Sequence, residues 1–348
     1  MTKVAVLGAT GMVGQRFVQL LENHPWFETV CLAASDASKG KQYGPAGNWV
    51  LDTEMPEFAG GMAVSGCTAK EVADSGAELA FSALPSDVAL RVEKELAAAG
   101  IGVVSKAAAH RMDADVPLLI PEVNPEHIGL IEAQRQNRNW AGFISSDPNC
   151  STCQLALALK PLQQFGPQQI IVTTMQAVSG AGFPGVPSLA IQNNAIPFIN
   201  GEEEKMEMEL AKMLGTLENG AVRHANMEVI ASCNRVNTQE GHLESVAIEF
   251  ADRPSLADIA QALEQFRGAP QQLGLPTAPT QPIVVRAEPD RPQPRKDWSA
   301  GNGMSVTVGR LRQKGSYTLF SCLASNTIRG AAGNGILHAE LLHKRGYI

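Results

Sequence analysis

Short apolar runs alternate with amphipathic stretches along the first 150 residues of the chain. Four of these runs predict strands, at residues 3–7, 29–35, 78–84 and 102–108, and the first of them is rich in β-branched residues. Residues 12–21 place their apolar side chains at helical spacing, and residues 85–100 predict a second helix that ends at a glycine. This alternation of strand and helix is typical of a parallel, doubly wound sheet of the α/β class.

The pattern changes after residue 150, where longer strands predominate. Residues 169–178 and 242–250 predict strands of a mixed or antiparallel sheet, so a second domain of the α+β class is expected. Helices are predicted over residues 202–215, 253–268 and 326–347. Residues 270–303 are rich in Pro and Gln and are predicted to be irregular.

Three glycines follow the first predicted strand at once. Gly8, Gly11 and Gly14 stand in "GATGMVG", between that strand and the helix it feeds. Glycines allow a backbone to approach a pyrophosphate closely, and a helix N-terminus offers unpaired N–H groups to an anion. An ordinary tight turn would need the glycines but not this strand–turn–helix context. The context therefore predicts a dinucleotide-binding turn.

The end of the second predicted strand carries conflicting signals about the dinucleotide. Asp36 is placed to accept a hydrogen bond from a ribose 2′-hydroxyl, which favours NAD. Ser35, Ser38, Lys39 and Lys41 are suited to a 2′-phosphate, which favours NADP. Spacing alone leaves both alternatives open. Loops after the other strands, such as residues 82–85, are expected to line the cofactor cleft.

The composition of the chain limits the classes of partner that are expected. The 348 residues carry a net charge of −7, with 18% charged and 44% hydrophobic residues. No basic surface is indicated, so nucleic acid is not an expected partner, and no apolar run is long enough for a membrane span. The six cysteines are scattered apart from one C-x-x-C, which predicts neither a disulfide framework nor a metal site. A reducing cytoplasm is therefore expected.

That single C-x-x-C lies in "SSDPNCSTC". Pro148 and Asn149 suit the start of a helix, so Cys150 is expected at or near a helix N-terminus. A helix dipole lowers the pKa of a thiol there and favours the thiolate that a nucleophile requires. Cys153 lies one turn further along and is predicted to pack in the interior. The pair is thus interpreted as one nucleophile and one packing residue.

A cysteine nucleophile requires an acid–base partner, and the chain has seven histidines. His24, His338 and His343 are predicted to be solvated or capping residues at helix ends. His242 differs, because it follows Gly241 at the start of a predicted strand and Arg235 lies seven residues earlier. This arrangement suits a base beside an anion-binding group, although an ordinary structural role is an equal alternative on these residues alone.

Seven motifs together resemble the aspartate-semialdehyde dehydrogenase family, in the branch typical of archaea and fungi. They run in order from residue 3 to about residue 340, so the resemblance covers nearly the whole chain. The motifs are "GATGMVG", "AHRMDADVPLLIPEVNPEH", "PNCST", "QAVSGAGFPGVPS", "GEEEKMEMEL", "NRV…GH" and "NTIRGAAGN".

The resemblance implies an architecture and a reaction. Residues 1–149 plus 326–348 would form a Rossmann-type NADP-binding domain, and residues 150–325 a catalytic and dimerisation domain of a homodimer or homotetramer. The reaction implied is the NADPH-dependent reductive dephosphorylation of β-aspartyl phosphate to aspartate semialdehyde. Cys150 would form a thioester, His242 would act as acid and base, and Gln176 would orient the reacting groups.

The family's binding residues also match positions in this chain. Substrate contacts are implied for Arg235 with the carboxylate, Glu202 with the ammonium, Lys205 and Arg111 with the phosphate, and Asn149 beside the nucleophile. Cofactor contacts are implied for Gly8, Thr10, Gly11, Met12, Val13, Ser35, Ser38, Ser82, Leu84, Pro85, Ser179, Gly180, Gly182 and Asn326. Ser35 and Ser38 match contacts to a 2′-phosphate, so the resemblance favours NADP. No metal is expected.

Some positions depart from the family pattern. Lys106 stands where the branch usually has asparagine, Ala107 or Ala108 replaces a serine, and Asp147 precedes Pro148 in place of asparagine. These changes border the expected acyl-phosphate site. They keep open a malonyl-CoA reductase on the same scaffold, although Glu202 has no ammonium to meet in malonate. A non-catalytic NADP-binding paralogue is the third alternative, and the retained Cys150 and His242 oppose it.

Overall fold

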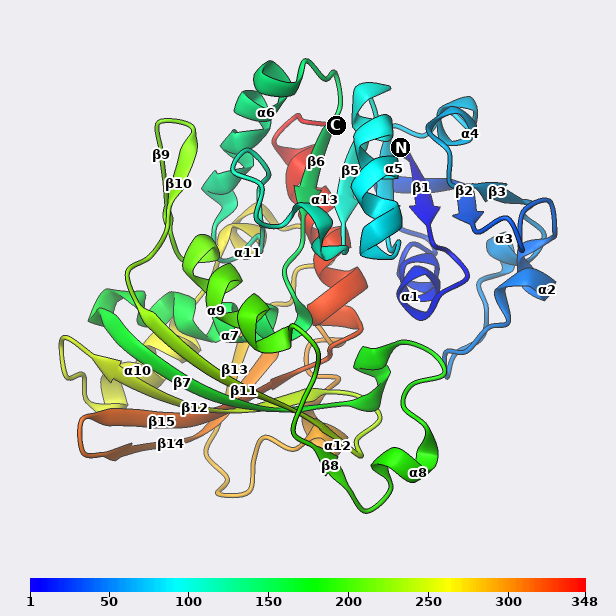
Figure 1. The fold of residues 1–348 in the computed structure, drawn as a ribbon. Helices are drawn as coiled ribbons and strands as arrows, with labels where there is room; N and C mark the ends of the chain where they lie inside the picture. The colour runs from blue at the N-terminus through cyan, green and yellow to red at the C-terminus, as the bar shows by residue number, and fades with distance from the viewer.

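The computed structural model describes residues 1–348, and Figure 1 shows a smaller parallel sheet above a larger mixed sheet. The parallel sheet has the strand order β3-β2-β1-β4-β5-β6. Its strands are β1 (Thr2–Leu7), β2 (Phe27–Ala34), β3 (Val64–Gly66), β4 (Leu79–Ser82), β5 (Gly102–Ser105) and β6 (Phe143–Ser146). The chain builds the sheet outward from β1 in one direction and then from β4 in the other. The carboxyl ends of β1 and β4 therefore border the crevice where such sheets bind ligands.

Helices follow the strands of this sheet and pack beside them (Figure 1). They are α1 (Met12–Leu20), α2 (Tyr43–Gly47), α3 (Glu57–Gly60), α4 (Ala69–Asp74), α5 (Ser86–Ala98) and α6 (Leu130–Arg138). The β1–α1 turn depends on glycine, because Gly8 has φ +71° and a Cβ at Gly14 would lie 2.1 Å from the Gly8 carbonyl oxygen. The helix therefore starts directly against the end of the strand.

The mixed sheet has seven strands in the order β13-β14-β15-β12-β7-β11-β8. They are β7 (Pro167–Gln176), β8 (Ala195–Ile196), β11 (Glu228–Val236), β12 (His242–Phe250), β13 (Ile283–Arg286), β14 (Val306–Lys314) and β15 (Tyr317–Ala324). A separate hairpin joins β9 (Thr216–Glu218) to β10 (Ala221–Arg223). Central β7 runs parallel to β11 and antiparallel to β12.

Two helices lie on the side of the mixed sheet that faces the parallel sheet (Figure 1). They are α7 (Cys150–Leu159), continued by a 3-10 turn (Lys160–Phe165), and α9 (Glu202–Met213). Helix α10 (Leu256–Gln265) and the short helices α8 (Ser188–Ile191), α11 (Ala269–Leu273) and α12 (Pro294–Asp297) complete this unit. From Ser151 to Leu159 every residue of α7 is buried, so this helix forms the centre of the second core.

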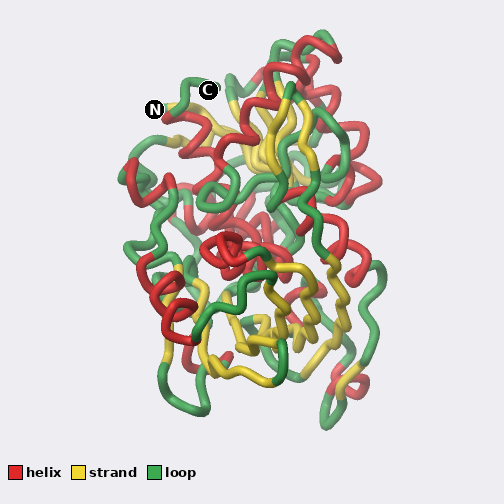
Figure 2. Tube along the Cα trace, turned by 90° about the vertical axis from the view of Figure 1, so that its left-hand side faces the viewer, coloured by secondary structure: helices red, strands yellow, loops and turns green.

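The C-terminal segment leaves the mixed sheet and returns to the parallel sheet. After β15 a π-helical turn (Ile328–Ala332) leads into α13 (Gly333–Lys344), which is buried from Gly333 to Leu342. His343 Nδ1 lies 3.2 Å from Thr2 Oγ1, and His24 Nε2 lies 2.9 Å from Glu340 Oε1. The two chain ends consequently lie near one another, as Figures 1 and 2 show.

The α/β class and the second mixed sheet confirm the predicted fold class. Most of residues 270–303 are irregular, as predicted, but the segment also contains the end of α11, strand β13 and helix α12, which the sequence did not indicate. Strand β13 pairs with β14 through Ile283 and Val306, and this long-range pairing outweighs the local Pro and Gln content. The last helix was predicted from residue 326 but begins at Gly333, after the π-helical turn.

Candidate active site

Three polar side chains meet where neighbouring strands of the mixed sheet end. Gln176 is the last residue of β7, Arg235 is its cross-strand partner on parallel β11, and His242 is the first residue of antiparallel β12. Their exposed fractions are 1%, 7% and 0%. Parallel and antiparallel pairing thus brings residues up to 66 positions apart (from 176 to 242) to one edge of the sheet.

Cys150 is the first residue of α7, as predicted, and faces this edge. Its Sγ lies 3.3 Å from Nε2 of His242. Asn149 caps the helix, because its side-chain oxygen accepts hydrogen bonds from the backbone N–H groups of Ser151 and Thr152 at 2.9 and 3.2 Å. The structure therefore brings the predicted nucleophile and the predicted histidine into contact.

The predicted lowering of the thiol pKa is wrong. Burial raises the pKa of Cys150 to about 12, and the charge of Glu202 acts in the same direction. Lys106, Arg111 and Arg235 oppose this rise without reversing it. The Asn149 side chain also accepts hydrogen bonds from two of the first N–H groups of α7, those of Ser151 and Thr152. Nearby cations, rather than the helix start, are thus the groups that favour a thiolate.

His242 is held in one orientation by the backbone. The N–H of Ala177 donates to Nδ1 at 3.0 Å, so the neutral ring carries its proton on Nε2, which points at Cys150. Burial, together with the charge of Arg235, lowers the pKa of His242 to about 3. Gly180 covers the ring so closely that a Cβ there would lie 3.0 Å from Cε1. The neutral histidine is therefore a hydrogen-bond donor toward the sulfur.

Glu202, the first residue of α9, ties Gln176 to Asn149. Its Oε1 accepts from Asn149 Nδ2 at 2.7 Å and from Gln176 Nε2 at 3.2 Å, and Lys205 Nζ lies 3.5 Å from Oε2. Glu202 is 6% exposed, whereas one third of the Lys205 side chain is exposed. Both residues thus lie on the Cys150 side of α9 and do not point into bulk solvent.

Two arginines flank the nucleophile with different partners. Arg235 Nη1 donates to the carbonyl oxygen of Ala177 at 2.7 Å. Arg111 Nη1 donates to Glu209 at 2.8 Å, and its Nη2 donates to the carbonyl of Lys106 at 2.8 Å. The Nε–H of Arg111 is buried without a partner. Both guanidinium groups keep donors that a substrate anion can accept from.

Lys106 and Asp147, two of the positions noted as departures from the motifs, form an ion pair. Lys106 Nζ lies 3.3 Å from Asp147 Oδ2, and Asp147 is fully buried. Burial by itself would raise the pKa of Asp147, but Lys106 and His338 hold it below its ordinary value. His338 Nδ1 lies 2.9 Å from Asp147, and its Nε2 lies 2.8 Å from Ser145 Oγ. Lys106 therefore has its counter-ion inside the protein.

The predictions for two of the other histidines are wrong. His338 is 0% exposed and His24 is 7% exposed, and each is bonded to a buried carboxylate rather than to solvent. The helix that carries His338 is enclosed on all sides, which its local sequence did not reveal. Cys153 is buried as predicted, with Sγ 3.3 Å from the carbonyl of Arg329.

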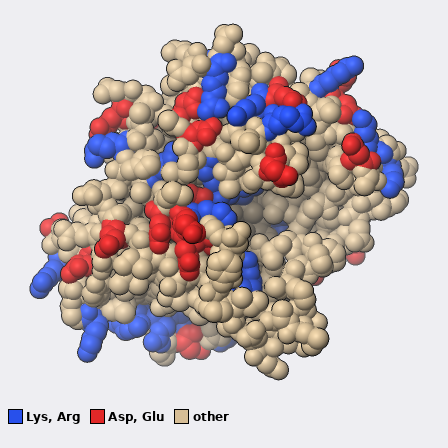
Figure 3. Space-filling view, viewed as in Figure 1, with Lys and Arg blue, Asp and Glu red and all other residues tan.

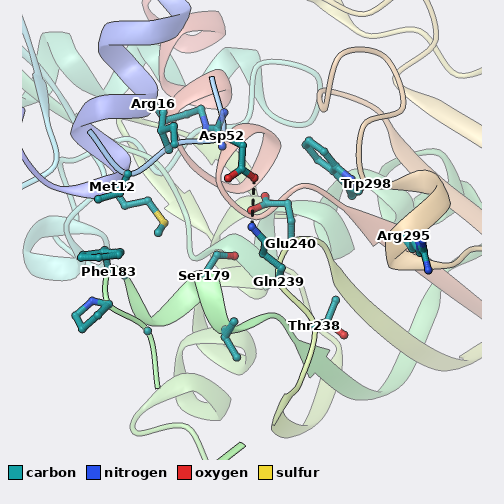
Figure 4. A pocket seen from close by; sticks show the side chains of 16 residues that line it. Met12, Arg16, Asp52, Ser179, Phe183, Thr238, Gln239, Glu240, Arg295 and Trp298 are labelled. Carbon is teal, nitrogen blue, oxygen red and sulfur yellow. Dashed lines mark hydrogen bonds between the residues drawn. The ribbon is translucent and has the colours of Figure 1, made fainter. Parts of the chain in front are cut away.

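A cavity of about 640 Å³ lies between the two units, and Figure 4 shows its lining. Met12 and Arg16 reach it from α1, and Ser179 and Gly182 from the loop after β7. Gln239 Nε2 donates to Asp52 at 3.2 Å across the cavity edge. Figure 3 shows the surface hollowed between the units. The predicted cofactor residues on α1 and on the second unit thus share one space.

Asn326 connects this cavity to the histidine. Its Oδ1 accepts from the N–H of Gly241 at 2.9 Å, and its Nδ2 donates to Ser179 Oγ at 2.9 Å. Gly241 immediately precedes His242. Asn326 therefore joins the Ser179 loop to the start of β12, beside the cavity.

The glycine turn presents an uncapped helix end. Helix α1 starts after Gly11 with no side-chain cap, so its first N–H groups lack side-chain partners next to Thr10 and Val13. A Cβ at Gly8 would lie 2.6 Å from the carbonyl of Ala83, so the loop before Leu84 and Pro85 packs on the turn. Such a cradle fits a pyrophosphate.

The remaining predicted cofactor residues differ in exposure. Ser35 is exposed and Ser38 partly exposed in the turn after β2, where the N–H of Ser38 donates to the Ser35 carbonyl at 2.9 Å. Ser82 is fully buried at the end of β4. Lys39 pairs with Glu71 at 2.8 Å.

Several residues of the site had no counterpart in the sequence predictions. Glu209 and Lys212 of α9 are buried and bind the segment around Arg111. Their spacing from Glu202, seven and ten residues, places all three on one side of the helix, which is the signal that could have found them. Ala177 contributes only backbone groups, which a side-chain pattern does not reveal. No group of three metal-ligating side chains occurs, and no helix is long and apolar enough to cross a membrane.

Comparisons with known proteins agree over the whole chain. Residues 3–131 match the NAD binding domain of semialdehyde dehydrogenase, and residues 159–329 match its dimerisation domain. An aspartate-semialdehyde dehydrogenase of Archaeoglobus fulgidus is 51% identical over 99% of both chains. A malonyl CoA reductase (NADP) of Metallosphaera sedula is 40% identical over 99% of this chain and 98% of its own. The structure of aspartate semialdehyde dehydrogenase with NADP from Candida albicans superimposes with a TM-score of 0.92, 40% identity and full coverage of both chains.

Proposed function

The chain belongs to the aspartate-semialdehyde dehydrogenase family, and we propose that it reduces β-aspartyl phosphate to aspartate semialdehyde and phosphate with NADPH. The observation that carries this proposal is the contact of Cys150 with His242, 3.3 Å long, surrounded by Arg235, Gln176 and Glu202. A nucleophile, a proton donor and groups for a carboxylate and an ammonium are what this substrate requires.

Cys150 forms the covalent intermediate. Its sulfur attacks the acyl carbon and the C–S bond forms, while phosphate leaves with the electrons of the C–O bond and takes up the thiol proton. NADPH, when bound, supplies the hydride that reduces the resulting thioester. The hemithioacetal then releases the aldehyde and returns the electron pair of the C–S bond to the sulfur.

The Nε2–H group of His242 donates a hydrogen bond to the oxygen of the tetrahedral intermediates. The hydrogen bond from Ala177 opposes a proton on Nδ1, so the ring can carry two protons only after that bond breaks. In the arrangement described, His242 is therefore a donor that stabilises the developing oxyanion. Proton exchange with the hemithioacetal, the role that the family resemblance implies, requires this rearrangement first.

Charged residues around Cys150 match the charged groups of the substrate. Arg235 offers a planar fork to the carboxylate, and Glu202 offers a carboxylate to the ammonium. Arg111 and Lys205 supply positive charge for the phosphate. Gln176 and Asn149 are fixed by their shared bond to Glu202, so they orient the acyl group relative to Cys150.

NADP is held by residues of both units. The turn at Gly8, Thr10, Gly11, Met12 and Val13 cradles the pyrophosphate at the uncapped start of α1. Leu84 and Pro85 border the crevice. Ser35 and Ser38 receive the 2′-phosphate, while Ser179, Gly180, Gly182 and Asn326 line the nicotinamide end. The cavity between the units, about 640 Å³, is of a size that such ligands occupy.

Two features favour this substrate over malonyl-CoA. Lys106 was the residue that kept the alternative open, but Asp147 neutralises it within the fold. Glu202 has no partner in malonate, and a second carboxylate beside it would be repelled. Malonyl-CoA reduction is accordingly the second candidate function, with the Metallosphaera sedula relative as its support.

We further propose a homodimer, or a homotetramer of two such dimers, in the cytoplasm. The face of the mixed sheet turned away from α7 exposes Ile171 on β7 and its cross-strand partner Ile230 on β11, at 37% and 43%. These residues lie in the region that matches a dimerisation domain. All six cysteines are free, which suits a reducing compartment. An Ile230→Asp variant should elute as a smaller species in size-exclusion chromatography.

We also propose a division of the chain into two domains. Residues 1–149 with 326–348 form one unit and residues 150–325 the other. The return of α13 to the parallel sheet supports this division.

The reverse reaction tests the function directly. NADP reduction is followed by absorbance with aspartate semialdehyde, with and without phosphate, and NADPH oxidation is followed with malonyl-CoA. Phosphate-dependent reduction of NADP supports the proposal. Turnover with malonyl-CoA alone would identify the second candidate, and NADP binding without turnover would indicate a non-catalytic paralogue.

A further inference from the structure

The inner side of α9 carries a second buried carboxylate, Glu209, two turns beyond Glu202. Glu209 is 2% exposed. Its Oε1 accepts from Arg111 Nη1 at 2.8 Å, and its Oε2 accepts from the backbone N–H of Asn149 at 2.7 Å. One carboxylate thus joins a guanidinium to the residue that immediately precedes Cys150.

The segment that carries Arg111 is held at further points. Arg111 Nη2 donates to the carbonyl of Lys106 at 2.8 Å. Lys212, one turn after Glu209, donates to the carbonyl oxygens of Arg111, Asp113 and Val116 at 2.7, 2.8 and 2.9 Å. Helix α9 therefore fixes both the backbone and the guanidinium of Arg111. The distance between Arg111 and the helix of Cys150 depends on α9.

We propose that Glu209 is a positioning residue that sets Arg111 at a fixed place relative to Cys150, so that Arg111 meets the phosphate of the substrate. This inference rests on the proposed function, because it takes Arg111 as a phosphate ligand. Glu209 itself does not touch the substrate in this assignment. It acts through the two donors that it holds.

The chemistry of the contact explains why a carboxylate is needed. Two donors approach two different oxygens, and both are buried. A glutamine has one acceptor oxygen, and its amide nitrogen is itself a donor. In a Glu209→Gln variant, either Arg111 or the N–H of Asn149 must lose its partner. A buried guanidinium that has lost a charged partner no longer has one preferred orientation.

The test compares Glu209→Gln with Glu204→Gln, an exposed glutamate of the same helix. In the reverse reaction, Glu209→Gln should raise the KM for phosphate about tenfold or more, the loss expected for one charged hydrogen bond. The KM values for NADP and aspartate semialdehyde should change less than about twofold, and Glu204→Gln should resemble the wild type. Glu209→Asp, which keeps both oxygens, should recover part of the phosphate affinity.

A double-mutant cycle separates positioning from general damage. In an Arg111→Ala background, adding Glu209→Gln should leave the KM for phosphate unchanged within about twofold, because Glu209 acts through Arg111. An unchanged phosphate KM in the single variant, or the same factor with and without Arg111, would overturn the inference. If Glu209→Gln does not fold, Glu209→Asp carries the same cycle. A wild-type enzyme without phosphate-dependent turnover would instead refute the proposed function.

Discussion

Lys106 and Asp147 form an ion pair inside the protein, with 3.3 Å between Nζ and Oδ2 and side-chain exposures of 9% and 0%. The pair lies close to the start of α7, since Asp147 precedes Cys150 by three residues and the charge of Lys106 acts on the Cys150 thiol. Both residues stand at positions that were noted above as departures from the motifs, and each supplies the charge that the other requires. The family-atypical lysine is consequently part of the scaffold.

Breaking this pair should destabilise the protein strongly. Lys106→Met leaves the Asp147 carboxylate buried without its cation, which should lower the free energy of unfolding by about 3–5 kcal/mol. Urea denaturation measures this. Adding Asp147→Asn should recover most of the loss. Lys39→Met is the matched control, because the Lys39–Glu71 pair lies at the surface and should contribute no more than about 1 kcal/mol. Equal losses in the two lysine variants would contradict the assignment.

The pair also has a defined pH range. The pKa of Asp147 is held below its ordinary value of 3.8. A carboxylate with a lowered pKa stabilises the fold fully above its ordinary pKa and loses that contribution as the pH falls through the lowered value. Wild type and the Lys106→Met, Asp147→Asn double variant should therefore differ in acid denaturation below about pH 4. Identical acid transitions would show that Lys106 contributes no charge stabilisation.

Glu244 should limit stability at alkaline pH. This β12 carboxyl group is 0% exposed, and burial raises its pKa from 4.5 to about 8. Since the unfolded chain ionises first, the free energy of unfolding should fall as the pH rises from about 4.5 to 8. Glu244→Gln should remove this dependence and stabilise the protein at pH 8, by at most about 5 kcal/mol. Thermal unfolding of wild type and Glu244→Gln at pH 4 and pH 8 tests this. A larger gain in stability of the variant at pH 4 than at pH 8 would contradict the prediction.

The two cysteines of the C-x-x-C should differ in function. Cys150→Ala should lower kcat by at least about 10⁴-fold, because no other nucleophile contacts His242. Cys153→Ala should keep kcat within a few fold and lose about 1 kcal/mol of stability, since its sulfur is a buried packing group. Activity with and without a reductant should be the same in wild type and Cys153→Ala. Protection from oxidation by Cys153→Ala would instead indicate a disulfide between the two.

Ser38 should determine part of the cofactor preference. Ser38→Asp places a negative charge in the turn after β2, beside the proposed site of the 2′-phosphate. The KM for NADP should rise about tenfold or more, whereas the KM for NAD, which lacks that phosphate, should change little. NAD is thus the internal control for folding. An equal rise in the KM values for NADP and NAD would show that the 2′-phosphate does not bind beside Ser38.

Local pattern predicted those parts of the fold in which local and long-range preferences agree. Apolar runs and glycine signals located β1, α1, β4 and α5, because the strands are buried on both faces and each helix buries one apolar side. Strand β13 was missed, because only its pairing with β14 makes it a strand. His338 was misplaced for a similar reason, since the partner Asp147 lies far away in sequence.

The site was predicted unevenly for a different reason. Cys150 and His242 were identified through their places at element starts and through the family motifs. The rise in the pKa of Cys150 was not, because it depends on burial and on the charges of Glu202, Lys106 and Arg111 around the sulfur. Glu209 was also overlooked, because glutamates on an acidic helix resemble a solvated surface until the opposing segment is known.

The place of α13 affects how the protein is made. Its apolar residues Ile336, Leu337 and Leu341 share one core with Phe17 of α1 and Phe81 of β4. This helix follows every strand of both sheets along the chain, so the first strands are synthesised long before the helix that covers them. The nascent N-terminal unit must therefore keep an apolar face uncovered until α13 has been synthesised. We expect the nucleotide-binding unit, although its strands are synthesised first, to reach its native state only after α13 has emerged.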